Sequence, residues 1–277
     1  MTRARRTFTS TFKAALLGQF RGYTLSGWTI SAILSPVFLF AGAFVVLRFL
    51  GQGASPSRFF ELTGYPSYVA FVILGVAFNG LGMSALEDGG NAVYEEESNG
   101  TWDVLSLAPF NRFVWMFAKT LAGLVTGFVD FFAVLALGSL VFGVTPTLHG
   151  LLVALVGIAL TLVALQGLGF FMAALGLRWK QPFALAFILS PVLVLLSGMM
   201  FPVQVLPSWL QPLANAIPLT HGLTIVRDAL LLDRGFSDLV PVFARLVVSG
   251  AILMAIGFFS FRYMETRARE RGILGRY

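Results

Sequence analysis

Long apolar runs separated by short polar segments dominate the chain. Six of these runs approach or exceed about 20 residues, the length of helix that crosses roughly 30 Å of hydrocarbon. They cover residues 28–47, 66–86, 113–144, 150–177, 182–203 and 239–261. The pattern predicts an all-α polytopic membrane protein with six transmembrane helices. We see no linker long enough to divide residues 1–277, so we expect a single transmembrane domain.

A shorter amphipathic segment precedes the first run. Phe8, Phe12, Leu16 and Phe20 recur at every fourth position, which places them on one face of a helix. This spacing is typical of a helix that lies in the membrane interface, and a solvated surface helix is the alternative. The first long run has no small-residue cleavage site, so we expect it to insert the chain rather than to act as a removable signal peptide.

Composition strengthens the membrane assignment. Hydrophobic residues make up 57% of the chain and charged residues 12%, against roughly 25% charged in an average soluble domain. This shortage of charge excludes an ordinary water-soluble enzyme. The net charge is +6, but the basic residues lie beside apolar runs, so lipid headgroups rather than nucleic acid are their expected partners. The absence of cysteine excludes disulfides and thiol nucleophiles.

The distribution of basic residues predicts the orientation. With six spans, 14 of the 19 lysines and arginines fall on the side that holds both termini. Cytoplasmic loops carry the excess of lysine and arginine in membrane proteins. Both termini are therefore predicted to be cytoplasmic.

The sequence gives no support for catalysis by this chain. No Gly-Lys pair is present, which excludes a phosphate-binding loop of the Walker type. The two histidines, His149 and His221, are far apart in sequence, so we expect no metal site. Ser190 and Ser197 have no nearby base in their apolar run, which argues against nucleophilic catalysis.

The segment between the second and third runs is acidic, although cytoplasmic loops are normally basic. Trp102 and Leu105 add apolar anchors to its charges. Such a mixture suits docking against a basic, grooved partner protein. A merely solvated loop is the alternative, but it leaves the tryptophan unexplained. The carboxylates of the segment are Glu87, Asp88, Glu95, Glu96, Glu97 and Asp103.

A second unusual segment follows the fifth run. Four of the 12 prolines fall between residues 202 and 218, which breaks the chain into short helices instead of a further span. Thr220 is expected to start a further helix that reaches Leu232. Apolar broken helices at membrane depth are tolerated only when they pack against protein or line a cavity. We therefore predict a lid on the outer side.

Both segments resemble motifs of the type-2 ABC (ATP-binding cassette) exporter permeases. The first is similar to the family's E-x-G-T-[LW]-[DE]-x-L-x-x-x-P loop, although Ser98 and Asn99 separate its acidic run from the glycine and Glu96 stands where arginine is common. Its matching residues are Glu95, Gly100, Thr101, Trp102, Asp103, Leu105 and Pro109. The second is similar to F-P-x-x-x-L-P-x-W-L…P-L-T…R. It is matched by Phe201, Pro202, Leu206, Pro207, Trp209, Leu210, Pro218, Leu219, Thr220 and Arg227.

The resemblance implies a role for each segment. Residues 7–25 would form an elbow helix, residues 94–107 a coupling helix, and residues 202–232 outer re-entrant helices. The coupling helix would contact a cytosolic ABC nucleotide-binding subunit through Glu95, Glu96, Glu97, Gly100, Thr101, Trp102, Asp103 and Leu105. The outer gate would comprise Phe201, Pro202, Leu206, Pro207, Trp209, Pro218 and Arg227. ATP and Mg would bind the partner subunit and no cofactor this chain. A second permease copy or a sister permease would complete the complex in the plasma (inner) membrane.

Three strongly polar residues lie within the predicted spans: Asn79, Asp130 and Gln166. An ionised carboxylate at the bilayer centre costs about 2.5–3.5 kcal/mol on insertion scales, so Asp130 should face protein or water. Each of the three either lines a pathway or forms a hydrogen bond between helices.

The leading hypothesis is a membrane subunit of an ATP-driven exporter for a hydrophobic or amphipathic substrate, such as a drug, an antibiotic or a lipid-like molecule. One alternative within the same complex type is export of a lipid-linked glycan or another polymer. Alternatives of other classes are an ion-coupled secondary transporter that uses Asp130 and a non-transporting membrane scaffold.

Overall fold

The computed structural model describes residues 8–15, 17, 56–101, 111–142, 147–179 and 182–270, and these ranges contain helices and loops but no strand. The predicted first span, residues 28–47, lies outside the described residues. The all-α fold class is therefore confirmed for the part of the chain that is described.

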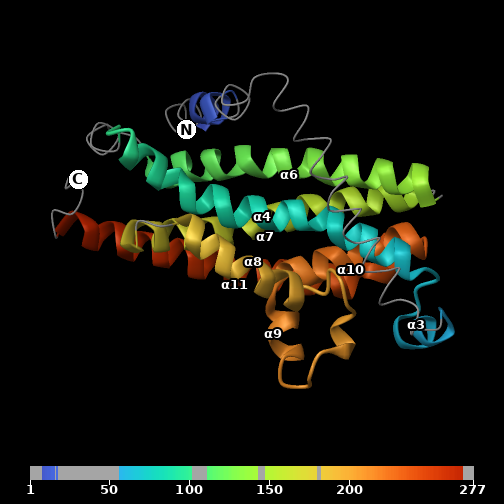
Figure 1. Cartoon of the computed structure of the whole chain (residues 1–277). Helices are drawn as coiled ribbons and strands as arrows, with labels where there is room; N and C mark the ends of the chain where they lie inside the picture. Colours follow the sequence, from blue (N-terminus) through green and yellow to red (C-terminus); the bar gives the residue numbers. More distant parts are fainter. Residues whose placement is uncertain are drawn as a thin grey trace.

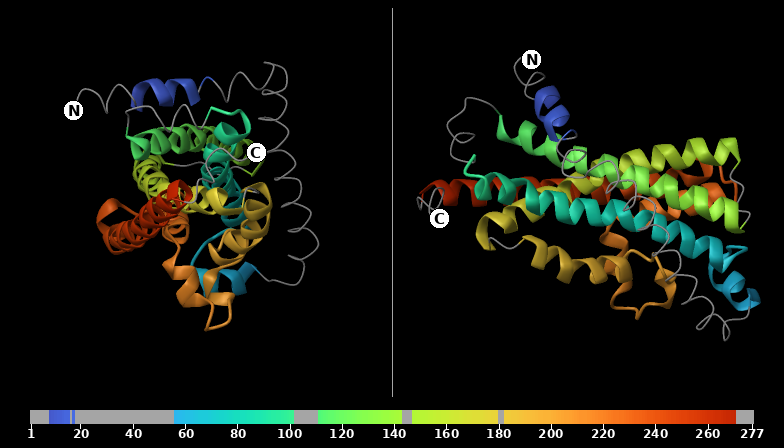
Figure 2. Two further views of the ribbon diagram at one scale, coloured as in Figure 1. Left: turned by 90° about the vertical axis from the view of Figure 1, so that its left-hand side faces the viewer. Right: turned by 45° about the horizontal axis from the view of Figure 1, so that its top comes forward.

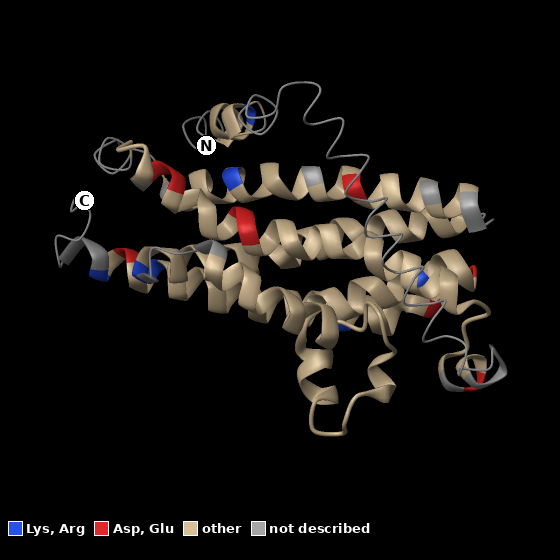
Figure 3. Cartoon of the chain, in the orientation of Figure 1, with Lys and Arg blue, Asp and Glu red and all other residues tan. Residues whose placement is uncertain are grey.

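Four long helices form the main bundle (Figure 1). They correspond to the second, third, fourth and sixth predicted spans, and each is long and apolar enough to cross a membrane. Their charged residues lie mostly toward the helix ends, with long uncharged middle sections (Figure 3). The four are α4 (Tyr68–Ser98), α6 (Arg112–Phe142), α7 (Leu148–Trp179) and α11 (Phe236–Glu270).

The packing places α4 at the centre of the bundle. It contacts α6, α7 and α8, and large side chains such as Phe71, Phe78 and Leu81 are fully buried against them. In the most apolar 18-residue stretch of each helix, 72% of α4 is buried and 28% of α11 is buried. The helix α11 packs mainly on α7. A helix that is apolar all round belongs in the interior or in lipid. The exposed apolar side chains of α11 therefore suit contact with lipid or with a partner helix.

The helix α8 (Pro182–Leu196) is shorter than the predicted fifth span, residues 182–203. It ends in a turn in which Gly198 has a φ of 75°, a backbone conformation that favours glycine. Four described helices have spanning length and α8 is a shorter apolar helix, so the six-span count is not confirmed.

The proline-rich segment after α8 forms short helices, as its prolines predict. These are η2 (Val203–Val205), α9 (Gln211–Ala216) and α10 (Pro218–Leu231). Proline stands at the start of α9 and α10, where its missing N–H costs no helical hydrogen bond. The loop that carries η2 and α9 projects from the side of the bundle, while α10 packs on α7 and α11 (Figures 1 and 2).

Two smaller helices complete the described structure. The helix α3 (Pro56–Thr63) precedes α4, and Phe59 packs its ring against Tyr68 and Phe71. Residues 8–15 are helical, and Phe8 lies 6.3 Å from the ring of Phe117 on α6. The predicted amphipathic segment therefore packs an aromatic face on the bundle at residue 8. Residues 7, 16 and 18–25 of the predicted elbow helix lie outside the described residues.

Candidate functional site

The acidic segment begins as a continuation of α4 rather than as a loop. The helix runs 12 residues past the predicted span end at residue 86 and stops only at Ser98. Residues 94–98, expected to open a separate coupling helix, form the last turn of α4, which corrects the predicted start of that helix. The turn 99–101 follows. Trp102, Asp103 and Leu105 lie outside the described residues, and so does the side chain of Glu97.

Glu96, Gly100 and Thr101 form the turn that ends α4. The N–H of Thr101 donates to the Glu96 carbonyl oxygen at 2.9 Å, and the Thr101 hydroxyl donates to the Glu96 carboxylate. The intervening Gly100 has a φ of 68°, which a residue with a Cβ adopts only with strain. The Gly-Thr pair of the family motif therefore has a structural role in this chain. Gly100 and Thr101 cap the C-terminus of α4 and set the direction of the chain after it.

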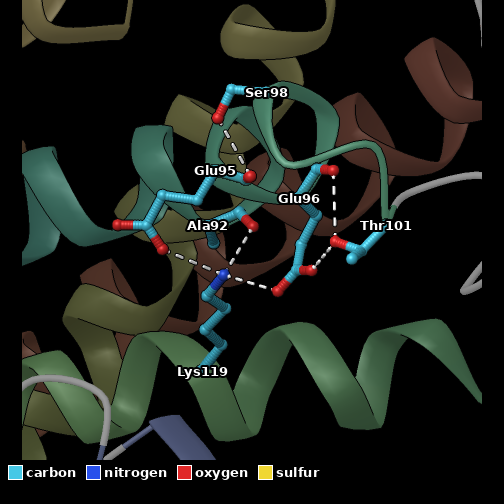
Figure 4. A network of polar contacts seen from close by, with 6 residues as sticks. All are labelled: Ala92, Glu95, Glu96, Ser98, Thr101 and Lys119. Atoms are coloured by element: carbon cyan, nitrogen blue, oxygen red, sulfur yellow. Dashed lines mark hydrogen bonds and ion pairs between the residues drawn. The ribbon is translucent and has the colours of Figure 1, made fainter. Parts of the chain in front are cut away.

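Lys119 on α6 holds this turn from the side (Figure 4). Its ammonium group lies 3.1 Å from a Glu95 carboxylate oxygen and 2.9 Å from one of Glu96, and it donates to the Ala92 carbonyl at 3.0 Å. The Lys119 side chain is only 15% exposed, so solvent screens these contacts less than those of a surface ion pair. We call Ala92, Glu95, Glu96, Thr101 and Lys119 the Lys119 cluster. It fixes the end of α4 to α6.

Replacing Lys119 with methionine should loosen this end of α4. The substitution keeps the length of the side chain and removes the donor that three acceptors share, so local opening should become about tenfold more frequent. Hydrogen exchange of the Thr101 amide measures the change. Lys13→Met, on the exposed side of the N-terminal helix, is the matched control. Unchanged exchange in Lys119→Met would contradict a stabilising role for the cluster.

A second polar cluster lies near the opposite end of the bundle, around Arg227 of α10. Its guanidinium group donates to the carbonyl oxygens of Phe71, Gly198 and Met199, at 2.9, 2.8 and 2.8 Å for the shortest bond to each. The guanidinium carbon also lies 3.3 Å from the centre of the Phe71 ring, a cation–π geometry. We call Arg227 and these three acceptors the Arg227 cluster. It joins α10 to the start of α4 and to the turn that ends α8.

The charge of Arg227 survives its burial. Burial lowers the pKa of Arg227 to about 9, so the guanidinium stays protonated at neutral pH. The acceptors Gly198 and Met199 lie in the turn that follows α8, and the charged guanidinium forms charge-assisted hydrogen bonds with both carbonyl oxygens. Arg227 therefore holds this turn in place.

Asp228, the next residue, forms a second buried network beside this cluster. The Tyr65 hydroxyl donates to the Asp228 carboxylate at 2.6 Å, and Arg234 pairs with its other oxygen at 2.9 Å. Burial, and then the nearby Asp228 carboxylate, raise the pKa of Tyr65, so its hydroxyl remains a donor at any physiological pH. This network ties the loop before α4 to α10.

The predicted outer-gate residues differ in burial. Arg227, Pro202 and Pro218 are buried, whereas Phe201, Pro207 and Trp209 are exposed and Leu206 is half-buried. Trp209 is 70% exposed in the loop that carries η2 and α9. Among the buried members Arg227 links α10 to the turn after α8, whereas the exposed members lie on the surface of the projecting loop.

The three polar residues predicted at membrane depth also differ in burial and in their contacts. Gln166 on α7 is fully buried and accepts a hydrogen bond from the Thr120 hydroxyl of α6, so it joins two helices. Asp130 is half-buried and lies beside Gly80 of α4, where a Cβ built on the glycine would be 3.4 Å from the Asp130 Cβ. Asn79 is half-buried. Within the described ranges, no three histidine, aspartate or glutamate side chains are close enough together to hold a metal ion.

Comparison with known proteins identifies the family. A family model described as ABC-2 type transporter matches residues 7–231, a range that contains both the Lys119 and the Arg227 clusters. The chain belongs to the ABC-2 type transporter family. This confirms the resemblance seen in the two sequence motifs. An ABC-2 permease is a membrane transport subunit, normally without catalytic activity of its own, and normally works with an ATP-binding cassette subunit.

Two curated relatives of this ABC-2 permease carry the same name. Each is an inner membrane transport permease YhhJ, one from Escherichia coli (strain K12) and one from Shigella flexneri. Each is 28% identical over 185 residues, which cover 66% of this chain and 49% of the relative. The permease therefore spans about half the length of the curated relatives it matches.

Three residues of the Lys119 cluster and of the Asp228 network were not predicted from the sequence as members of a site: Lys119, Tyr65 and Asp228. Lys119 entered the sequence analysis only as one of the basic residues that predict the orientation. Tyr65 and Asp228 had no predicted role. The sequence does contain a sign that Asp228 has a structural role. It follows Arg227 in a largely apolar helix, and a carboxylate in such a helix needs a hydrogen-bond or ion-pair partner. Nothing in the sequence around Tyr65 marks it as that partner, since 163 residues separate the two.

Proposed function

We propose that this chain is the membrane-spanning subunit of an ATP-driven exporter in the plasma (inner) membrane, with both termini cytoplasmic. A separate ABC nucleotide-binding subunit would bind and hydrolyse ATP with Mg. A second permease copy or a sister permease would complete the membrane part. The substrate is a hydrophobic or amphipathic molecule.

The Lys119 cluster is the observation that supports this proposal most strongly. It anchors the turn that leads into Trp102 to both α4 and α6, so a force applied after Thr101 acts on two long helices at once. Loops at this place in the family contact the ATPase subunit. Closure of two ATPase subunits on ATP would move the α4–α6 ends of both permeases and shift the helices around a central pathway.

The proposal is tested by co-expression with a candidate ABC nucleotide-binding subunit from the same organism. Copurification and ATP hydrolysis are expected for the native pair, and both should fall at least about tenfold when Gly100, Thr101 and Trp102 are replaced together by alanine. Replacement of Ser208, Trp209 and Leu210 by alanine is the matched control, because it likewise changes three consecutive residues and removes one tryptophan. Normal association of the first variant would contradict the proposal.

The same preparation separates the proposal from the ion-coupled alternative. Reconstituted transport should stop when ATP is removed and should persist in the Asp130→Asn variant. Transport that continues without ATP and is lost in Asp130→Asn would instead identify a secondary transporter.

A further inference from the structure

A groove between α4 and α8 has a volume of about 920 Å³. The two helices pack side by side (Figure 2). Several apolar side chains of α8 are exposed, among them Phe187, Ile188 and Leu195. Apolar side chains form most of the wall, among them Met83, Phe187, Val194, Leu195 and Phe201. Pockets of about 300–1,000 Å³ with apolar walls and few polar groups are typical of small-molecule sites. The groove is too small for a polymer.

Glu87 is the acidic residue among the side chains that line the groove. It lies within the stretch of α4 that is long and apolar enough to cross a membrane. No described residue forms a hydrogen bond or an ion pair with it. By contrast, Glu95 and Glu96 pair with Lys119, and Asp228 pairs with Arg234. Glu87 is exposed, so a carboxylate without a partner among the described residues lies open beside an apolar wall, where a cation would complete the site.

We propose that this groove binds a lipophilic monocation, with the apolar body of the ligand against Phe187 and Val194 and its cationic centre beside Glu87. The inference rests on the proposed function and narrows it: the exported substrate is an amphipathic cation rather than a neutral lipid or an anion. Glu87 is then the residue that determines the charge of the accepted substrate.

The geometry of the groove supports this choice of ligand. Phe187 is 81% exposed and Leu195 is 46% exposed, so both offer apolar surface to a ligand. A cation in an apolar environment gains more from one carboxylate than it does in water, because the attraction is less screened. An anion of the same size meets the same wall but is repelled by Glu87. The groove should therefore bind a lipophilic cation more tightly than an anion of the same size.

Tetraphenylphosphonium and tetraphenylborate test this discrimination, since they have nearly the same shape and opposite charge. Binding of each is measured on the full chain in lipid nanodiscs, with empty nanodiscs as the blank. Glu87→Gln should weaken phosphonium binding about tenfold and leave borate binding equal or stronger. Glu61→Gln, which removes an exposed carboxylate from α3, should change neither. Equal phosphonium affinity in the native chain and Glu87→Gln would overturn the proposal.

A second variant guards against a folding defect in the first. Met83 lies one turn before Glu87 on α4 and also lines the groove, so lysine at this position can pair with the carboxylate. Met83→Lys should therefore lose phosphonium binding while the carboxylate stays in place, and should retain borate binding as evidence of an intact groove. Unchanged phosphonium binding in this variant would show that the probe binds elsewhere, and would overturn the proposal.

The probe-binding test and the ATPase-association test of the proposed function give independent results. Probe binding requires neither ATP nor the ATPase subunit. Loss of ATPase association with intact, Glu87-dependent phosphonium binding would refute the exporter and leave the binding site. Normal ATPase association with phosphonium binding that ignores Glu87 would refute only the site.

Discussion

Replacing Arg227 with leucine is expected to lower the free energy of unfolding by about 4 kcal/mol, one of the two largest effects predicted for a single substitution in this chain. The side chain is buried and forms charge-assisted hydrogen bonds with carbonyl groups of Gly198 and Met199, which lie in the turn after α8. Leucine offers no donor, so these carbonyls would stay buried without a partner. The turn would then separate from α4 and α10.

Unfolding in mixed micelles with increasing SDS, followed by tryptophan fluorescence, measures this loss. Arg245→Leu is the matched control, because Arg245 is exposed on α11 and donates to the carbonyl of Pro241 in its own helix. Its effect should stay within about 0.5 kcal/mol. Arg227→Lys should retain part of the stability, since an ammonium reaches fewer of the carbonyls than a planar guanidinium. A loss no larger than that of Arg245→Leu would show that the Arg227 cluster is dispensable.

Replacing Gly89 with alanine is expected to destabilise the permease by about 3 kcal/mol, the upper part of the range for overpacked interiors. At this position α4 crosses α7 in close contact, and an added Cβ would overlap the main chain of Gly169, 2.5 Å from its carbonyl oxygen. Because backbone atoms cannot rotate out of the way, the two helices must separate. The same SDS titration measures the change.

Gly80 supplies the control within the same helix. A Cβ built there would have its nearest neighbour 3.4 Å away, at the Cβ of Asp130, which is ordinary van der Waals contact. Gly80→Ala should therefore be neutral or stabilising by up to about 1 kcal/mol, since alanine favours helix more than glycine does. Equal effects at the two positions would show that the α4–α7 crossing does not depend on a small residue.

Much of the fold follows from the apolar pattern. The described long helices begin and end within a few residues of the predicted spans at the third and fourth runs, because length and hydropathy alone decide which segments fit a bilayer. The break after the fifth run also follows from composition, since proline cannot continue a helix. The sequence predicts Arg227 as a functional residue only through its place in the family motif.

Other features depend on contacts that no local pattern contains. The predicted end of the second span at residue 86 is wrong because carboxylates usually mark the end of an apolar helix. Here Lys119 pairs with Glu95 and Glu96, and α4 stays helical to Ser98. The partners of Arg227 are main-chain carbonyls, which every residue has, so the sequence cannot single them out. The groove at Glu87 likewise depends on where α8 packs.

The length and attachment of α4 make it a rigid lever. With 31 residues it spans about 46 Å, and the Lys119 and Arg227 clusters grip it near its two ends. Rotating such a rod by about 5° around one end moves the other end by about 4 Å, roughly the width of a methylene chain. A rotation of about 5° imposed at the α4–α6 end would therefore displace the Arg227 end by about the width of one acyl chain, without any bend in α4.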